Sequence, residues 1–282
     1  MAHSLLCGLI GAGIQRSLSP ALHEEEGRHH GLQVRYRLID LDVLGAGSEA
    51  LPGLLRDAVR EGYRGLNITF PCKQAVMPLL DGLSEEARAI GAVNTVVIAD
   101  GKLTGHNTDG SGWGWGFRRA LPKADLSRVV LLGAGGAGAA VGYAALGLGV
   151  QELWVSDIDS SRAAALASSL GSQFAGKKVV QARDLKTAVQ AADGLIHCTP
   201  TGMTGHPGMP LQEEWLRREM WVSEIVYVPL ETPLLKAARR IGCATADGGH
   251  MNVGQALRGF KLFTGLDADA ARMDAHFRRL VS

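Results

Sequence analysis

Short apolar runs alternate along the chain with longer segments in which apolar residues recur at helical spacing. The short runs are rich in β-branched residues and bounded by turn residues, which is typical of β-strands. They lie at 5–10, 36–41, 65–70, 93–99, 129–132, 153–156, 179–181, 194–198 and 221–226. The helical segments lie at 51–60, 73–80, 84–90, 138–148, 160–170, 185–192 and 233–241. This alternation predicts an α/β fold with largely parallel sheets.

The length and the distribution of glycine predict two domains. The chain has 282 residues, which is enough for two ordinary domains. Glycines concentrate between Gly105 and Gly149, around the run Gly110-Ser-Gly-Trp-Gly-Trp-Gly116, and we place the junction there. We expect boundaries at 1–108, 109–246 and 247–282, with the last segment forming C-terminal helices that return to the first domain. Since no low-complexity linker separates the domains, we expect them to pack across a cleft, which is the usual place for a ligand.

Charge and cysteine placement exclude several classes of partner. The chain has 29 Lys and Arg against 28 Asp and Glu, so no overall field attracts it to nucleic acid or anionic lipid. No apolar stretch reaches the roughly 18 residues of a membrane span. The cysteines lie far apart and show no zinc-binding spacing; they are Cys7, Cys72, Cys198 and Cys243. We therefore expect a cytoplasmic protein with reduced thiols and with no metal, nucleic-acid or membrane partner.

The most specific local motif is a glycine-rich turn between a predicted strand and a predicted helix. The strand at 129–132 is followed by Gly133, Ala134, Gly135, Gly136, Ala137 and Gly138. In a GxGxxG turn the first glycine permits the tight turn, the second lets the backbone approach a pyrophosphate, and the third lets the helix pack on the strand. Methyltransferases and flavoproteins also use glycine loops. The strand, turn, helix, strand and following acid together favour a nicotinamide dinucleotide.

Asp157 follows the next predicted strand and is the candidate for the ribose contact. A carboxylate at this place hydrogen-bonds the 2′-hydroxyl of NAD and repels the 2′-phosphate of NADP. We therefore expect NAD, with NADP as the alternative. Two other interpretations stay open, because Arg162 follows closely enough to hold a phosphate and because Asp is also a favoured helix N-cap.

Polar side chains of the first domain fall at the ends of predicted strands or in turns, where loops on a rigid scaffold present chemistry. They form the strings Ser17-Leu-Ser19-Pro20, Asn67-Ile-Thr69-Phe-Pro71-Cys-Lys73, Gly91-Ala-Val-Asn94-Thr95 and His106-Asn-Thr-Asp109-Gly110. Lys73 opens a predicted helix, whose positive end favours the neutral amine. Such a lysine can exchange a proton with a hydroxyl, with Asp109 orienting it. A solvated surface lysine is the alternative.

Seven strings together resemble the shikimate dehydrogenases and their quinate/shikimate dehydrogenase relatives. They recur in the family's order over nearly the whole chain, and their joint occurrence is specific where each alone is not. The strings are SLSPALH (17–23), NITFPCK (67–73), GAVNT (91–95), NTDG (107–110), GAGGAG (133–138), TPTGM (199–203) and YVPLETPLL (227–235). The resemblance implies a substrate-binding and catalytic domain at 1–108 and a Rossmann-type, doubly wound NAD(P)-binding domain at 109–246.

The resemblance also implies roles for single residues. Lys73 and Asp109 match the family's catalytic pair, which handles the hydroxyl proton while hydride passes between C3 of shikimate and the nicotinamide. The substrate carboxylate is expected at Ser17 and Ser19. The other substrate contacts are expected from Asn67, Thr69, Lys73, Asn94, Asp109 and Gln255. Cofactor contacts are expected from the glycine turn and from Asp157, Arg162, Thr199, Met203, Val226, Gly248 and Met251.

Two stretches depart from the family pattern. Asp157-Ile-Asp159 replaces the Asn-Arg-Thr of many NADP-dependent members and resembles the NAD-using quinate/shikimate members. The family's Asn-Ala-Thr-Ser string reads His197-Cys-Thr-Pro200, and we interpret His197 as a packed structural histidine rather than a general acid or base. We expect shikimate as the first substrate, quinate as a second, and a monomer or a homodimer. The alternatives are an enzyme acting mainly on quinate and a dinucleotide-binding sensor with little catalysis.

Overall fold

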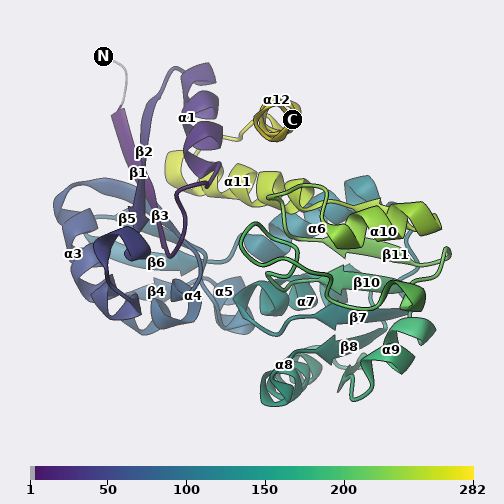
Figure 1. Ribbon diagram of the computed structural model, residues 1–282. Coiled ribbons are helices and arrows are strands. Elements are labelled where there is room, and N and C mark those ends of the chain that lie inside the picture. Colours follow the sequence, from purple (N-terminus) through teal and green to yellow (C-terminus); the bar gives the residue numbers. More distant parts are fainter. Residues whose placement is uncertain (1–3) are drawn as a thin grey trace. The chain divides into compact units, whose positions relative to one another are not determined.

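A computed structural model describes residues 4–282, which divide into two compact units. Unit 1 contains the described residues up to Thr108 together with Gln255–Leu280, and unit 2 contains Asp109–Gly254. The second boundary between the units falls inside a helix, α11 (Gly248–Thr264), which Figure 1 draws near the yellow end of the colour scale.

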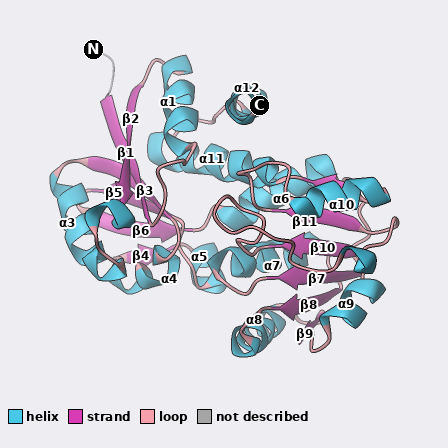
Figure 2. Ribbon diagram, in the orientation of Figure 1, coloured by secondary structure: helices cyan, strands magenta, loops and turns pink. Residues whose placement is uncertain are grey.

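Unit 1 is built on a mixed six-stranded sheet with the order β2-β1-β3-β5-β6-β4 (Figure 2). The strands are β1 (Ser4–Gly11), β2 (Gln33–Asp40), β3 (Tyr63–Ile68), β4 (Gly82–Leu83), β5 (Thr95–Ala99) and β6 (Lys102–His106). The helices are α1 (Ser19–His29), α2 (Leu41–Leu44), α3 (Leu51–Arg60), α4 (Cys72–Ala75), α5 (Glu85–Ile90), the end of α11, and α12 (Ala270–Val281). β1 runs parallel to β2 and β3, but β5 runs antiparallel to β3 and β6. Since β4 also runs parallel to β6, three of the five strand pairs in the described sheet are parallel, and the prediction misses only the two antiparallel pairs that β5 makes.

A two-residue turn explains the antiparallel pair. β5 and β6 are joined by Asp100 and Gly101, whose φ angles are both positive, at 51° and 74°. Two residues of this conformation link adjacent antiparallel strands, and Asp-Gly is among the sequences that adopt it most readily. The apolar runs of the sequence do not predict β6, because polar residues interrupt this strand.

Unit 2 is a doubly wound sheet in which all six strands run parallel, in the order β12-β11-β10-β7-β8-β9. The strands are β7 (Arg128–Leu132), β8 (Glu152–Ser156), β9 (Lys178–Gln181), β10 (Gly194–His197), β11 (Trp221–Glu224) and β12 (Ala244–Ala246). The helices are α6 (Asp109–Ala120), α7 (Gly136–Leu148), α8 (Ser160–Gln173), α9 (Leu185–Ala191), α10 (Pro233–Ile241) and the start of α11. This strand order is that of dinucleotide-binding domains, so the predicted Rossmann-type fold is confirmed.

Helices α1 and α2 lie where the sequence predicts no helix, and two other segments also differ from the prediction. The segment 73–80 is not one helix, because α4 is a single turn and a 3-10 turn at Met77–Leu79 follows it. Pro78 lacks the N–H that a continuing helix needs. The glycine-rich run 110–116, for which no helix is predicted, lies in α6. A Cβ added at Gly110 would lie 2.7 Å from the carbonyl oxygen of Ala140 in α7, so the bare backbone allows close helix packing.

Each unit has its own apolar core. The core of unit 1 includes Ile10 of β1 and Leu66 of β3, and that of unit 2 includes Val130 of β7, Leu195 of β10 and Val222 of β11. Strands covered by helices on both faces read as continuous apolar runs, which is why the strands of unit 2 are easy to predict. Within residues 4–282, no helix combines the length and the apolar character that a bilayer crossing needs.

Candidate active site

Ser17 lies in the loop between β1 and α1, and Ser19 is the first residue of α1. The hydroxyl of Ser17 donates to Oγ of Ser19 at 3.2 Å and accepts the backbone N–H of Ser19 at 3.3 Å. α1 has 11 residues and no acidic side chain in its first turn. Because the start of a helix carries partial positive charge, two hydroxyls at this place suit a carboxylate ligand.

The buried carboxylate of Asp40 holds the loop between β1 and α1, residues 12–18, in place. Asp40 ends β2 and accepts four hydrogen bonds of 2.9–3.1 Å, two on each oxygen. The donors are the backbone N–H groups of Gly13, Ile14 and Asp42 and the side-chain amide of Gln15. Burial alone raises the pKa of Asp40, but the hydrogen bonds outweigh burial and leave the pKa below its ordinary value. The loop carbonyl at position 14 in turn accepts the N–H at position 17 at 2.9 Å, so the carboxylate positions the serines.

Asn67 belongs to a buried hydrogen-bonded cluster at the end of β3. Its amide donates to Oγ1 of Thr95 at 3.1 Å, and its oxygen accepts from the hydroxyl of Tyr36 at 2.6 Å. A Cβ added at Gly259 in α11 would lie 3.7 Å from Nδ2 of Asn67. Gln255 precedes Gly259 by one helical turn and shares its face of the helix, so α11 brings Gln255 to the same side as Asn67 within unit 1.

Asn94 holds the chain directly before the predicted catalytic carboxylate. Its Oδ1 accepts the backbone N–H of Thr108 at 2.7 Å, and its amide donates to Oγ1 of Thr108 at 2.9 Å. Asp109 is the next residue, is buried, and begins α6 at the start of unit 2.

Thr69 and Lys73 follow β3 on the segment that contains α4. The N–H of Thr69 donates to the carbonyl of Ile10 at 2.9 Å, and the carbonyl of Lys73 accepts the N–H of Val93 at 2.9 Å. Lys73 is half-buried. Since α4 is a single turn, few aligned peptide dipoles act on the amine, and the end of this helix influences it less than predicted.

The glycine turn, 133–138, connects β7 to α7 in unit 2. A Cβ added at Gly133 would lie 2.6 Å from the carbonyl oxygen of Cys198, and one at Gly138 would lie 1.9 Å from the carbonyl oxygen of Gly133. A Cβ at Gly135 would meet nothing within 4 Å. The turn is therefore closed towards the protein and open at the N-terminus of α7, which is the shape that a pyrophosphate requires. These residues fit a dinucleotide.

Asp157 binds the glycine turn and does not cap a helix. Its Oδ2 accepts the N–H of Ala134 at 2.7 Å and its Oδ1 accepts the N–H of Asp159 at 2.9 Å. The N-cap of α8 is Asp159, which accepts the N–H of Ser161 at 2.9 Å, so the alternative in which Asp157 is the cap is wrong. Arg162 is exposed and lies 3.6 Å from a carboxylate oxygen of Asp159.

Thr199 contacts the glycine turn from the neighbouring strand. It follows β10, and a Cβ added at Gly133 would lie 3.1 Å from its Cγ2. β7 and β10 are the adjacent strands at which the order of the sheet reverses. Doubly wound domains bind ligands outside the carboxyl ends of the strands at this point.

The last four predicted cofactor residues are also in unit 2. A Cβ added at Gly248 would lie 2.2 Å from the carbonyl oxygen of Val226, so the start of α11 touches the chain after β11. Met251 is buried one turn along α11, whereas Met203 is partly exposed in the loop after β10.

Comparisons with known proteins place the chain in a family. Residues 9–96 match the model of the shikimate dehydrogenase substrate binding domain. The chain is 54% identical over 279 residues to the shikimate dehydrogenase (NADP(+)) of Streptomyces avermitilis, covering 98% of this chain and 96% of the relative. It is 49% identical over 283 residues to the quinate/shikimate dehydrogenase (NAD(+)) of Corynebacterium glutamicum strain R, covering 99% and 100%. The chain belongs to the shikimate dehydrogenase family.

A solved structure extends the likeness to the fold. Quinate dehydrogenase from Corynebacterium glutamicum in complex with NAD matches with a TM-score of 0.90 at 48% identity, covering 98% of this chain and 99% of that one. The predicted two-domain α/β fold and the predicted enzyme class are confirmed, and this family member is an oxidoreductase that acts on a CH–OH group. The relatives are named for different cofactors, so membership in the family does not choose between NAD and NADP.

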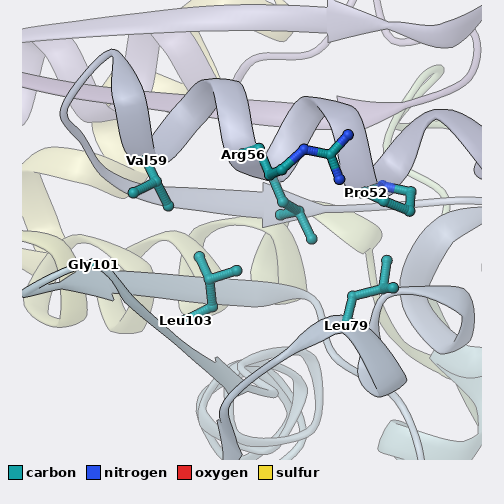
Figure 3. A pocket seen from close by; sticks show the side chains of 7 residues that line it. Pro52, Arg56, Val59, Leu79, Gly101 and Leu103 are labelled. Carbon is teal, nitrogen blue, oxygen red and sulfur yellow. The ribbon is translucent and has the colours of Figure 1, made fainter.

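Unit 1 of this shikimate dehydrogenase homologue also has an apolar cavity of about 400 Å³ apart from the predicted site residues. It is lined by Pro52, Leu55, Arg56, Val59, Leu79, Gly101 and Leu103 (Figure 3). Arg56 is the only charged residue of this lining, and the cavity offers no group suited to the reaction.

Sequence reasoning missed residues that hold the site in place. Thr95 and Thr108 lie inside strings that resemble the family, next to Asn94 and Asp109, so the sequence could have identified them. Asp40 and Tyr36 lie on β2, where nothing in the local sequence distinguishes them from other strand residues. Glu224, at the end of β11, is equally unmarked.

Proposed function

We propose that this enzyme interconverts shikimate and 3-dehydroshikimate by hydride transfer at C3, with NAD preferred to NADP. The observation that carries the cofactor preference is the hydrogen bond of 2.7 Å between the Asp157 carboxylate and the N–H of Ala134 in the glycine turn. A carboxylate at this position lies where the ribose of a bound dinucleotide is expected, and it repels a 2′-phosphate. Arg162 is the competing phosphate ligand, but its partner is Asp159.

The cofactor site comprises the glycine turn with residues from four neighbouring segments, which follow β8, β10 and β11 or begin α11. When bound, the cofactor accepts or supplies the hydride of the reaction. The backbone of the turn binds the pyrophosphate at the start of α7. The remaining contacts come from Asp157, Thr199, Met203, Val226, Gly248 and Met251.

The substrate site comprises the polar residues of unit 1. Ser17 and Ser19 bind the carboxylate at the N-terminus of α1. The ring hydroxyls are bound by Asn67, Thr69, Asn94 and Gln255. Buried amides and hydroxyls suit a small polyhydroxy acid, because an analogue that leaves them unpaired binds poorly.

Lys73 and Asp109 act as the catalytic pair. During oxidation the amine of Lys73 accepts the proton of the C3 hydroxyl, and Asp109 supplies the negative charge that balances it; the proton returns during reduction. Lys73→Ala is expected to lower kcat about a thousandfold, within the range of general acid–base catalysis, with unchanged affinity for the cofactor. Normal turnover in this variant would refute the assignment.

Quinate is the second candidate substrate. The identity of 49% to a quinate/shikimate dehydrogenase and the TM-score of 0.90 to a quinate dehydrogenase favour it. Quinate carries an additional hydroxyl at C1 and lacks the ring double bond. The choice between the two acids therefore depends on the surroundings of Ser17 and Ser19.

The decisive experiment is a matrix of both acids with both cofactors, followed by the absorbance of the reduced nicotinamide. We expect the highest kcat/KM for shikimate with NAD. A higher value with NADP would reverse the cofactor assignment, and a higher value with quinate would reverse the substrate assignment. Binding of NADH without turnover of either acid would favour a sensor.

A further inference from the structure

His197 and Glu224 form a fully buried pair at the carboxyl ends of two neighbouring strands. His197 ends β10 and Glu224 ends β11. Nδ1 of the imidazole lies 2.9 Å from each carboxylate oxygen. The other ring nitrogen, Nε2, lies 2.5 Å from Oγ1 of Thr199. Burial agrees with the interpretation of His197 as a structural histidine, but packing alone does not account for two polar partners.

Glu224 also gathers donors from the chain that follows it. Its Oε1 accepts the N–H groups of Ile225 at 2.8 Å and Val226 at 3.0 Å, and its Oε2 accepts the hydroxyl of Thr232 at 3.0 Å. Thr232 is the N-cap of α10. A buried carboxylate needs this number of donors to offset the loss of water. One side chain therefore holds the loop after β11 and the start of α10, and through His197 it also holds the loop after β10.

That last loop lies against the glycine turn. A Cβ added at Gly133 would lie 2.6 Å from the carbonyl oxygen of Cys198 and 3.1 Å from Cγ2 of Thr199, the nearest side-chain atom. The N–H of Cys198 donates to the carbonyl of Leu132 at 2.7 Å. A shift of Thr199 therefore changes the wall of the turn in which the dinucleotide is proposed to bind.

We propose that His197 and Glu224 are positioning residues for the nicotinamide cofactor and act through the hydroxyl of Thr199. With Nδ1–H donated to the carboxylate, Nε2 carries the lone pair and accepts the hydroxyl proton of Thr199. The oxygen of Thr199 then acts only as an acceptor, and the N–H of Thr201 approaches it at 3.3 Å. Its remaining capacity suits a hydroxyl or amide donor of the dinucleotide. This inference rests on the proposed binding of the cofactor at the glycine turn.

The test is direct binding of NADH and NADPH to the enzyme without substrate, combined with KM values for cofactor and shikimate. Thr199→Val removes the hydroxyl at similar volume. His197→Asn keeps a donor for Glu224 but is too short to reach Thr199. For each variant we expect the cofactor Kd to rise about tenfold, the equivalent of one hydrogen bond, while the KM for shikimate changes less than about twofold.

A double-mutant cycle separates positioning from a general loss of stability. If His197 acts through Thr199, His197→Asn adds less than about twofold to the cofactor Kd once Thr199→Val is present. Additive effects would overturn the proposal, and so would a His197→Asn variant that melts earlier but binds both dinucleotides normally.

Ser223→Ala is the matched control. Ser223 precedes Glu224 on β11 and therefore points to the opposite face of the sheet, where its oxygen accepts the indole N–H of Trp113 at 2.9 Å. This variant also loses a buried hydrogen bond, and we expect a lower melting temperature with an unchanged cofactor Kd. Because the cycle measures binding alone, it decides the role of His197 even if the enzyme turns over neither acid, the outcome that would refute the proposed function.

Discussion

The two units share a strand-end sequence and use it differently. Gly-Ala-Gly occurs at 11–13, where β1 ends, and at 133–135, directly after β7. In each unit a carboxylate at the end of the neighbouring parallel strand accepts a backbone N–H of this turn. Asp40 accepts from Gly13, and Asp157 accepts from Ala134. The common arrangement is a strand end tied to its neighbour by one carboxylate.

The two strand ends differ in how soon the next helix begins. α7 begins at Gly136, within the glycine turn, and Gly138 lets it pack closely on the strand. In unit 1 the position of the third glycine holds Arg16, and α1 begins only at Ser19. The longer loop presents side-chain hydroxyls that suit a carboxylate, whereas the short turn presents backbone N–H groups that suit phosphates.

The two carboxylates also differ in spare capacity. Asp40 is 4% exposed and accepts two hydrogen bonds on each oxygen, which uses the approximately four acceptor sites of a carboxylate. Asp157 is half-buried, and each of its oxygens accepts one backbone N–H. Asp40 is thus committed to holding its loop, and Asp157 retains acceptor sites for a ribose.

Substitutions in the glycine turn are expected to have the largest effects. Gly138→Ala would place Cβ 1.9 Å from the carbonyl oxygen of Gly133, so we expect a loss of at least about 4 kcal/mol of stability or failure to fold. Gly135→Ala meets nothing within 4 Å, so urea unfolding should be unchanged while the cofactor Kd rises about a hundredfold. Normal cofactor binding by Gly135→Ala would show that the phosphates bind elsewhere.

Asp40→Asn tests the committed carboxylate. The side-chain NH2 that replaces one oxygen is a donor and cannot accept the two hydrogen bonds that this oxygen accepts. We therefore expect a loss of about 3 kcal/mol of stability and a rise in KM for shikimate of about a hundredfold. The cofactor Kd should stay constant. Asp42→Asn removes the same charge from the exposed neighbour and serves as the control. If both variants raised the KM equally, the effect would come from charge and not from the position of the loop.

The sequence predicts the buried strands of unit 2 well, because an apolar run between turn residues has few alternatives. It fails for α6, since glycine has poor helix propensity. In this helix Gly110 permits close contact with α7 and Gly116 permits close contact with α11, and no local pattern contains that information.

The residues of the candidate site likewise fall into those that local sequence motifs predict and those that only the fold brings to the site. Ser17, Asn67 and Lys73 stand in motifs and can be found from the sequence. Asp40 and Glu224, which hold loops far from them along the chain, depend on strand order and register and can be found only in the fold.

The buried histidines of the two units provide a test by pH. His197 has a carboxylate partner, whereas Nε2 of His23 has none and its ring packs among Tyr36, Phe260 and Phe263. Burial lowers the pKa of His23 from 6.5 to about 4. The folded state therefore binds fewer protons than the unfolded state, and stability that is complete above pH 6.5 is lost as the pH falls towards 4.

Urea unfolding at two pH values measures this loss. We expect about 2 kcal/mol less stability at pH 5 than at pH 7 from His23. His23→Leu keeps an apolar side chain of similar size and should remove this share of the pH dependence. An equally steep dependence in the variant would assign the loss to other groups.

Asp157→Asn tests whether the free acceptor sites of Asp157 bind the ribose, and it has the smallest expected effect of these substitutions. The remaining oxygen accepts the N–H of Ala134, and the exposed N–H of Asp159 bonds to water instead, so stability should change by less than about 0.5 kcal/mol. Without the charge, the contact to a 2′-hydroxyl weakens and the repulsion of a 2′-phosphate disappears. We expect the NAD-to-NADP ratio of kcat/KM to fall about tenfold, or about 1.4 kcal/mol. In the control, Asp159→Asn, the partner of Arg162 loses its charge; if only this variant shifted the ratio, Arg162 and not Asp157 would decide the choice of cofactor.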